Sequence, residues 1–344
     1  MSTNRSSKYR SRGSSPRLIG LSISYQRENL LSRGLGLEHL RELLLRLARP
    51  LLRQGASLAY GGHWHETEDN FTFDLLRLIS AEQEDNSLGG PDTNLVIGRL
   101  YNHSPWPGYL DVTPRVEAQW INCCRIVRIT QQLAGISDAD LVPDSEARSG
   151  SDRAILNTAI SLSAMRRLAV QGVMIAIPGL ASPEAVPPVC AGVILGGKVH
   201  GFSGFMPGIF EEALVALEKR MPLYILGGFG GAAEILAKAL LEPVGHRRDE
   251  LTIDWQNAHT PTLVKLAHLS QTLSCAPGLR GSSASLDLLA TQIDSAKSSL
   301  ADALNTGLAE AATRELLVTQ DMRRAVQLVR DGLANKIGLQ TLPA

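Results

Sequence analysis

The residues best suited to binding chemistry are glycines that follow apolar segments. In "PLYILGGFGGAAEILAKAL", residues 222–240, an apolar segment ends in four glycines and a helix-like segment begins. The turn consists of Gly227, Gly228, Phe229, Gly230 and Gly231. Bare N–H groups and the helix dipole favour an anion at the start of a helix. The stretch therefore predicts either a phosphate-binding turn or a tight corner in which glycine relieves crowding.

Two other apolar segments also end in glycine pairs. Gly61 and Gly62 follow "ASLAY", and Gly196 and Gly197 follow "AGVIL". Right-handed crossovers bring the carboxyl ends of parallel strands to one edge, where open α/β sheets bind ligands. We therefore expect the three glycine corners to converge on one crevice for a phosphate or nucleotide. Lys198 could neutralise that phosphate, or it could be a solvated loop lysine.

Hydroxyl groups end the first apolar segment, "RLIGLSISY", at residues 17–25. This segment lacks the GxGxxG fingerprint of dinucleotide-binding proteins, which follows the first strand and precedes an acidic residue. It offers Ser22, Ser24 and Tyr25 instead. Their hydroxyls could hydrogen-bond a phosphate, or they could be ordinary cap and turn residues.

Histidines and aromatic residues in two predicted loops are weaker candidates. His63 and His65 form an HxH pair, which can bind zinc when both lie on one strand face. They follow a glycine corner, so we expect a loop that contacts ligand or solvent, and we predict no metal site. Trp106 and Tyr109 in "YNHSPWPGYLD" could stack on a base, or they could belong to a lid or an interface.

Continuous apolar segments alternate with segments of helical periodicity along the first 240 residues. This alternation predicts a Rossmann-like, doubly wound α/β fold with a mainly parallel sheet and helices on both faces. The predicted strands are residues 17–25, 56–62, 93–100, 124–130, 191–197 and 221–227. We expect a disordered tail at 1–16, an α/β domain at 17–250, a helical insertion at 251–312, and a final strand and helix at 313–335.

Composition narrows the expected partners and location. Lys plus Arg and Asp plus Glu are equal at 34 each, whereas a nucleic-acid binder would show a basic surplus. No apolar run approaches the ~20 residues of a membrane helix, and the N-terminal stretch lacks the apolar core of a secretory signal. The four cysteines are scattered and include no CxxC pair. We therefore expect a cytoplasmic protein that binds neither nucleic acid nor membrane.

The combination of these features resembles the SLOG superfamily, which includes the LOG enzymes, DprA and the ligand-sensing domain of TRPM channels. LOG enzymes carry a PGGxGTxEE motif, and "LGGKVHGFSGFMPGIFEE" at 195–212 is similar to it in part. An insertion that contains Gly204 separates the glycine pair from the rest, and Ile209 replaces the threonine. The retained positions after this insertion are Gly208, Glu211 and Glu212.

The resemblance extends over roughly residues 18–243 and includes the expected terminal strand and helix. LOG enzymes have an arginine in an M-x-x-R helix, and "AMRRLA" is similar, which implies that Arg166 or Arg167 takes that role. "PLYILGGFGGAA" resembles a bacterial SLOG subgroup that is linked to TIR and other antiphage effectors.

Two functions follow from this resemblance. The first is a sensor of a nucleotide-derived ligand, such as ADP-ribose, cyclic ADP-ribose or NAD, in antiphage or stress signalling. The alternative is a LOG-like N-glycosidic hydrolase, either a phosphoribohydrolase or an NAD glycohydrolase. In that enzyme Glu211 or Glu212 would stabilise positive charge on the ribose and Arg166 or Arg167 would hold the phosphate. The acidic pair would also be favourable at a helix start without any catalytic role.

The resemblance also implies a homo-oligomer and an effector partner protein. Beyond the nucleotide ligand we expect no cofactor.

Overall fold

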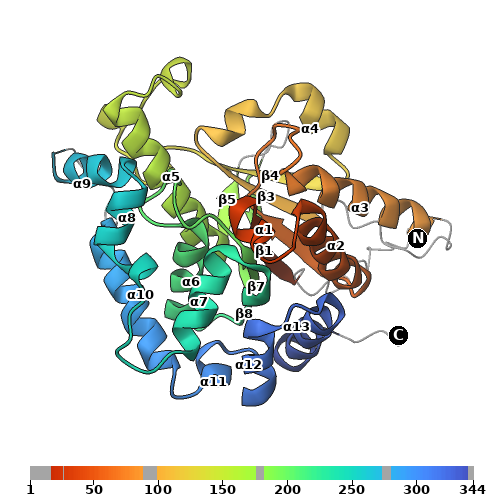
Figure 1. Cartoon of the computed structure of the whole chain (residues 1–344). Coiled ribbons are helices and arrows are strands. Elements are labelled where there is room, and N and C mark those ends of the chain that lie inside the picture. Colours follow the sequence, from red (N-terminus) through yellow and green to blue (C-terminus); the bar gives the residue numbers. More distant parts are fainter. Residues whose placement is uncertain (1–16, 26, 88–98, 176–181, 273–279, 340–344) are drawn as a thin grey trace, which may run out of the picture.

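A six-stranded, entirely parallel sheet forms the centre of the molecule, and helices cover both of its faces (Figure 1). The computed structural model describes residues 17–25, 27–87, 99–175, 182–272 and 280–339. The sheet has the order β4-β3-β2-β1-β7-β8. Its strands are β1 (Leu18–Ser24), β2 (Ser57–Tyr60), β3 (Leu100–Pro105), β4 (Cys124–Ile129), β7 (Val189–Gly196) and β8 (Leu223–Leu226). The predicted Rossmann-like α/β fold is therefore confirmed.

The strand order reverses at β1, which lies between β2 and β7. The chain first builds β2, β3 and β4 outward on one side, and it later adds β7 and β8 on the other. Such a reversal leaves a crevice at the carboxyl ends of the two central strands. In this protein it lies above Ser24 of β1 and Gly196 of β7, which are paired in the register.

Side chains of β1 alternate between the two faces of the sheet. Ile19, Leu21 and Ile23 join a large core cluster with α2 (Leu37–Arg53), α3 (Phe71–Ser87) and α13 (Met322–Ile337). On the opposite face lie α5 (Asp152–Gln171), α6 (Gly208–Glu218) and α7 (Gly231–Leu241). Figure 1 shows these two groups of helices on either side of the strands. The leucines of α2 that the sequence places at helical spacing are buried within the chain's own core.

A small antiparallel hairpin of β5 (Val173–Ile175) and β6 (Glu184–Val186) precedes β7. The shorter helical elements of the α/β part are α1 (Arg27–Leu31), η1 (Gly108–Asp111), α4 (Pro114–Trp120), η2 (Asp138–Asp140), η3 (Asp144–Glu146), η4 (Gly227–Phe229) and η5 (Asp249–Leu251). The C-terminal region continues with α8 (Ile253–His259), α9 (Thr262–Thr272), α10 (Ser282–Ala296), α11 (Leu300–Ala303) and α12 (Glu310–Val318). The predicted tail at 1–16 lies outside the described residues.

The prediction of a final strand in the segment 313–335 is wrong. Residues 310–318 form α12, and α13 follows, so nothing described after residue 250 joins the sheet. The helices at 251–312 are therefore not an insertion before a last strand but the start of a helical C-terminal region. A short apolar run such as "ELLV" does not distinguish a buried strand from a helix. β8 instead forms a hydrogen bond with the segment after α11. The N–H of Leu223 donates to the carbonyl oxygen of Leu304 at 2.9 Å.

The third strand also lies later than predicted. We expected a strand at 93–100 and a loop at 103–109, but β3 extends from Leu100 to Pro105. Residues 93–98 are outside the described part. Buried Asn102, His103 and Ser104 make this strand polar, and polar residues conceal a strand from apolar periodicity.

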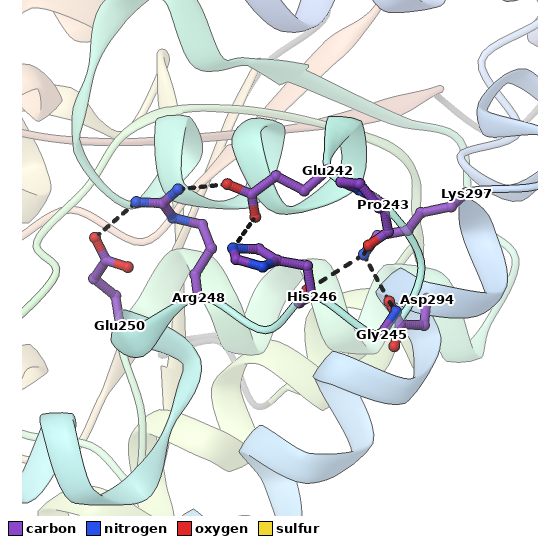
Figure 2. A network of polar contacts seen from close by, with 8 residues as sticks. All are labelled: Glu242, Pro243, Gly245, His246, Arg248, Glu250, Asp294 and Lys297. Atoms are coloured by element: carbon purple, nitrogen blue, oxygen red, sulfur yellow. Dashed lines mark hydrogen bonds and ion pairs between the residues drawn. The ribbon is translucent and has the colours of Figure 1, made fainter.

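A network of polar contacts joins the end of α7 to α10 (Figure 2). Lys297 has only 5% of its side chain exposed, and its ammonium donates to Pro243 O at 2.9 Å. The same group pairs with Asp294 at 2.6 Å. Arg248 pairs with Glu242 at 2.7 Å in the same network. Carbonyl oxygens beyond a helix C-terminus attract a cation, so Lys297 ties α10 to the turn after α7.

We predict that Lys297→Met lowers the free energy of unfolding by about 1–3 kcal/mol, because a carbonyl and a carboxylate lose their donor in a nearly buried position. Lys265→Met is the matched control, since Lys265 pairs with Asp152 at 2.7 Å while 43% and 61% of the two side chains are exposed. It should change the free energy by less than about 0.5 kcal/mol. Urea unfolding measures both, and equal effects would contradict a structural role of the network.

Candidate functional site

A cavity of about 560 Å³ lies between the sheet and the helices α5 and α6. Its floor is the face of β1 and β7 opposite the α2 helix. Gly20 and Gly192 are paired in the register there, so these two strand positions add no side chain to the layer between strands and helices. The volume falls within the range of about 300–1,000 Å³ that is usual for small-molecule sites.

The polar end of the cavity lies at the carboxyl edge of the strands. Ser22, Ser24, Gly61 and Lys198 line it. The backbone N–H of Lys198 donates to Ser24 Oγ at 3.2 Å and so joins the loop after β7 to the end of β1. Two hydroxyls and an ammonium group at the edge of a parallel sheet suit an anionic ligand.

Arg166 joins the two helices of the cavity through a pair of carboxylates. Its guanidinium reaches from α5 to α6, where Nη1 donates to Glu211 and Nε lies 3.7 Å from Glu212 Oε1. The hydroxyl of Ser22 donates to Glu212 and connects this cluster to β1. A Cβ on Gly208 would lie 2.7 Å from Arg166 Nη2, so glycine at the start of α6 leaves room for the guanidinium. The cluster therefore holds α5, α6 and β1 in one arrangement.

Burial raises the pKa of Glu212 above its ordinary value of 4.5, while Arg166 and Ser22 oppose that shift. The 28% of this side chain that is exposed forms part of the cavity wall. The two carboxylates together outweigh the charge of the one guanidinium. These carboxylates therefore offset the positive charge of Arg166, so the cluster as a whole attracts a phosphate weakly. Glu212 is a carboxyl group that can exchange a proton at the cavity.

Tyr60 and His103 also line the cavity, and sequence analysis missed both. Burial, and then the charge of Glu212, raise the pKa of Tyr60, so its phenol stays protonated and can donate a hydrogen bond. Burial lowers the pKa of His103 to about 4, which keeps the imidazole neutral. Its Nε2 has no hydrogen-bond partner among the described residues. Tyr60 directly precedes Gly61, a position that could have indicated it, whereas His103 was assigned to a loop.

The structure places other predicted residues on the cavity wall as well. Gly204 and Gly208 line it, and so does His63. His65 instead pairs with Asp111 at 2.9 Å. A search of the described residues finds no group of three or more His, Cys, Asp or Glu side chains arranged to hold a metal.

Several predicted residues lie outside the cavity wall. Glu211 is bound to Arg166 behind it, and Arg167 is not part of it. Tyr25 packs toward the core cluster on the α2 side, and Gly62 is packed by the Tyr60 ring and Thr72. Of the two arginines and two glutamates proposed from the sequence, Arg166 and Glu212 therefore line the cavity, whereas Arg167 and Glu211 do not.

The turn at 227–231 does not reach the cavity. A Cβ on Gly228 would overlap the carbonyl oxygen of Thr319, and one on Gly227 would lie 2.5 Å from Leu317 O. The end of α12 thus occupies this corner, with Phe229 buried beside it. The structure supports the alternative of a tight corner in which glycine relieves crowding.

The corner after β7 is also packed by protein atoms. Gly196 and Gly197 have φ values of +63° and +95°, which favour glycine. A Cβ on Gly196 would lie 2.7 Å from Ser24 O, and one on Gly197 would overlap Ile209. The corner carrying Gly230 and Gly231 packs directly against it, since a Cβ on Gly231 would lie 2.5 Å from Gly197 O. Two of the three glycine corners therefore meet, but protein atoms pack them, and of the glycines in the three corners only Gly61 lines the cavity.

The aromatic residues of the 101–111 segment are not on the cavity wall either. Trp106 is fully buried and its indole N–H donates to Asp144 at 3.0 Å. Tyr109 packs against the same small cluster. They stabilise the segment after β3 instead of stacking on a ligand.

The molecule is thus an α/β protein with a built ligand cavity at the switch point of its sheet. The family model described as SLOG cluster2 matches residues 14–179 and 184–316. This match covers most of the chain, so the protein belongs to that SLOG family. A search of curated proteins finds no match. None of the helices in the described ranges has the length and apolarity to cross a membrane.

We predict that Gly228→Ala lowers the free energy of unfolding by about 3 kcal/mol, because the added carbon overlaps backbone that cannot rotate away. Gly108→Ala is the control, since its Cβ would meet only Ser104 Oγ at 3.6 Å. Thermal unfolding of both variants compares them. A Gly228→Ala variant as stable as the control would show that the corner has free space.

We also predict that Glu212 makes the stability pH-dependent. Because its folded pKa is raised, the folded state binds this proton more tightly than the unfolded chain. The contribution is greatest below pH 4.5 and declines as the pH rises through the folded pKa. The stability of wild type relative to Glu212→Gln should therefore fall over the pH range that extends upward from 4.5 through the raised folded pKa. Denaturant unfolding across this range measures it, with exposed Glu66→Gln as control, and a difference that rises with pH would contradict the assignment.

Proposed function

We propose that this protein binds a nucleotide-derived ligand, of the ADP-ribose, cyclic ADP-ribose or NAD type, and acts as a sensor in bacterial antiphage or stress signalling. The observation that carries the proposal is the cavity between β1, α5 and α6, with Ser22, Ser24 and Lys198 at its polar end. Membership of a SLOG family supports a ligand of this kind.

The charge distribution favours phosphate recognition by Lys198 over recognition by Arg166. Arg166 is already paired with two carboxylates, whereas Lys198 forms no ion pair with the described residues and its side chain is exposed at the cavity. Hydroxyls of Ser22 and Ser24 lie at the same edge and can donate to phosphate or ribose oxygens. A binding role needs no more than these groups.

A second candidate function is N-glycosidic hydrolysis of a nucleotide, and one specific observation favours it. Glu212 is a cavity carboxyl group with a raised pKa, held by Ser22 and Arg166. Such a group can stabilise an oxocarbenium-like ribose or protonate a leaving base. In this mechanism Arg166 would position Glu212 instead of holding the phosphate.

The proposed signalling role implies self-association and an effector partner. Because the leucines of α2 are buried inside the chain, they provide no argument for an oligomer. Self-association therefore stays a prediction from family resemblance, and light scattering against the monomer mass of 37.1 kDa tests it.

We predict that Lys198→Ala weakens binding of ADP-ribose or AMP by about ten-fold or more, because one charge-assisted hydrogen bond is lost. Lys265→Ala, a surface lysine of α9, is the matched control and should bind like wild type. Isothermal titration calorimetry with AMP, ADP-ribose, cyclic ADP-ribose and NAD measures both variants. Absence of binding to all four ligands by wild type would overturn the proposed function.

Chromatography of the same mixtures distinguishes the two candidate functions. A sensor leaves each nucleotide intact, whereas a hydrolase releases free base. In a hydrolase, Glu212→Gln should remove turnover and keep ligand affinity close to wild type, because the carboxyl acts mainly in the transition state. Release of base that persists in Glu212→Gln would exclude Glu212 as the catalytic carboxyl.

A further inference from the structure

The cavity extends inward from its polar end toward the amino ends of the strands. Ser24 at the edge lies four residues after Gly20 at the inner end of β1, a length of about 13 Å in an extended strand. The side chains around this inner end are small or apolar. They belong to Ala59, Ala169, Val170, Val189, Val215, Met221 and Leu223.

The floor of this inner end includes the backbone of two glycines. Gly20 and Gly192 are register partners on adjacent parallel strands, and both line the cavity. A Cβ on Gly192 would lie 3.3 Å from Met221 Cε and 3.6 Å from Leu223 Cδ1. A Cβ on Gly20 would lie 3.1 Å from Val189 Cγ1, so the side chains of Val189 and Met221 border the two glycines. A larger side chain at Gly192 would therefore press on Met221 and narrow the inner end of the cavity.

The roof of the inner end consists of aliphatic side chains one helical turn beyond the polar cluster. Ala169 and Val170 follow Arg166 on α5 at the i+3 and i+4 positions, and Val215 follows Glu212 on α6 at i+3. Residues at this spacing share one face of a helix, about 5.4 Å further along its axis. The same two helices therefore present polar groups at the edge and aliphatic groups over the glycine floor.

We propose that this inner end is a slot for the planar base of the nucleotide, which enters first, with its ribose beside Glu212 and its phosphate at Lys198. This inference rests on the proposed function and gives the ligand an orientation. A flat ring fits between a backbone floor and an aliphatic roof and gains dispersion contacts on both faces. A phosphate at the inner end would lose its water without any charged or polar side chain to replace it, which is costly.

The slot also limits the ligand class. It takes one uncharged ring, so a dinucleotide must leave its second nucleoside outside the polar end. The inner end recognises the base of the ligand, and the polar end at the strand edge recognises its sugar and phosphate.

The experiment compares Gly192→Val, which fills the slot from the floor, with Ala169→Leu, which fills it from the roof. Gly108→Val is the matched control, outside the cavity wall. Circular dichroism and thermal unfolding establish that each variant is folded. The probes are AMP, ribose 5-phosphate and the fluorescent free base 2-aminopurine, which separate the base from the sugar-phosphate end.

We expect AMP and 2-aminopurine to bind about ten-fold or more weakly to both slot variants, while ribose 5-phosphate binds all proteins alike within about two-fold. Slot variants that bind AMP like wild type would overturn the inference. So would folded variants that lose ribose 5-phosphate together with AMP. Wild type that binds ribose 5-phosphate but not 2-aminopurine refutes the slot alone. Binding of 2-aminopurine without ribose 5-phosphate refutes the phosphate site and leaves the slot standing.

Discussion

The guanidinium of Arg166 lies between two carboxylates, and the shape of the cavity depends on this contact. It joins α5 to α6 through Glu211 and Glu212, and Ser22 joins the acidic pair to the central strand. Breaking one partner of a poorly solvated ion cluster costs several kcal/mol, because the remaining charge has no water to replace it. The ion cluster therefore fixes the positions of α5 and α6 relative to β1 and keeps the cavity between them open.

Glycine has two opposite uses in this fold. Gly20 and Gly192 place no side chain of their own on the sheet face, and the cavity extends beside them, next to Val189 and Met221. At residues 227–231 glycine allows the backbone of α12 to approach, so that the space is filled by protein. Glycines inside the strands thus line the cavity, whereas the glycines of the strand-to-helix turn close a corner.

The helical C-terminal region contributes to the site from a distance. Besides filling the corner beside β8, it supports the loop that follows β7. The N–H of Gly201 in that loop donates to Thr260 Oγ1 at 3.0 Å, just beyond α8. The rings of Trp255 and His259 stack beside it with centroids 3.8 Å apart. The cavity wall is consequently a product of the whole described chain rather than of the α/β part alone.

The sequence by itself determined the parallel α/β architecture, because apolar strands and helical periodicity are local patterns that burial on both faces requires. It also indicated Ser22, Arg166, Lys198 and Glu212, whose types and neighbours are visible in one dimension. Only the tertiary structure decided that Arg166 and not Arg167 meets the carboxylates, and that α12 fills the 227–231 corner. The glycine pair in the floor was equally invisible, because Gly20 and Gly192 lie half the length of the chain apart in the sequence. Space between packed elements depends on such distant pairings, and no local pattern records them.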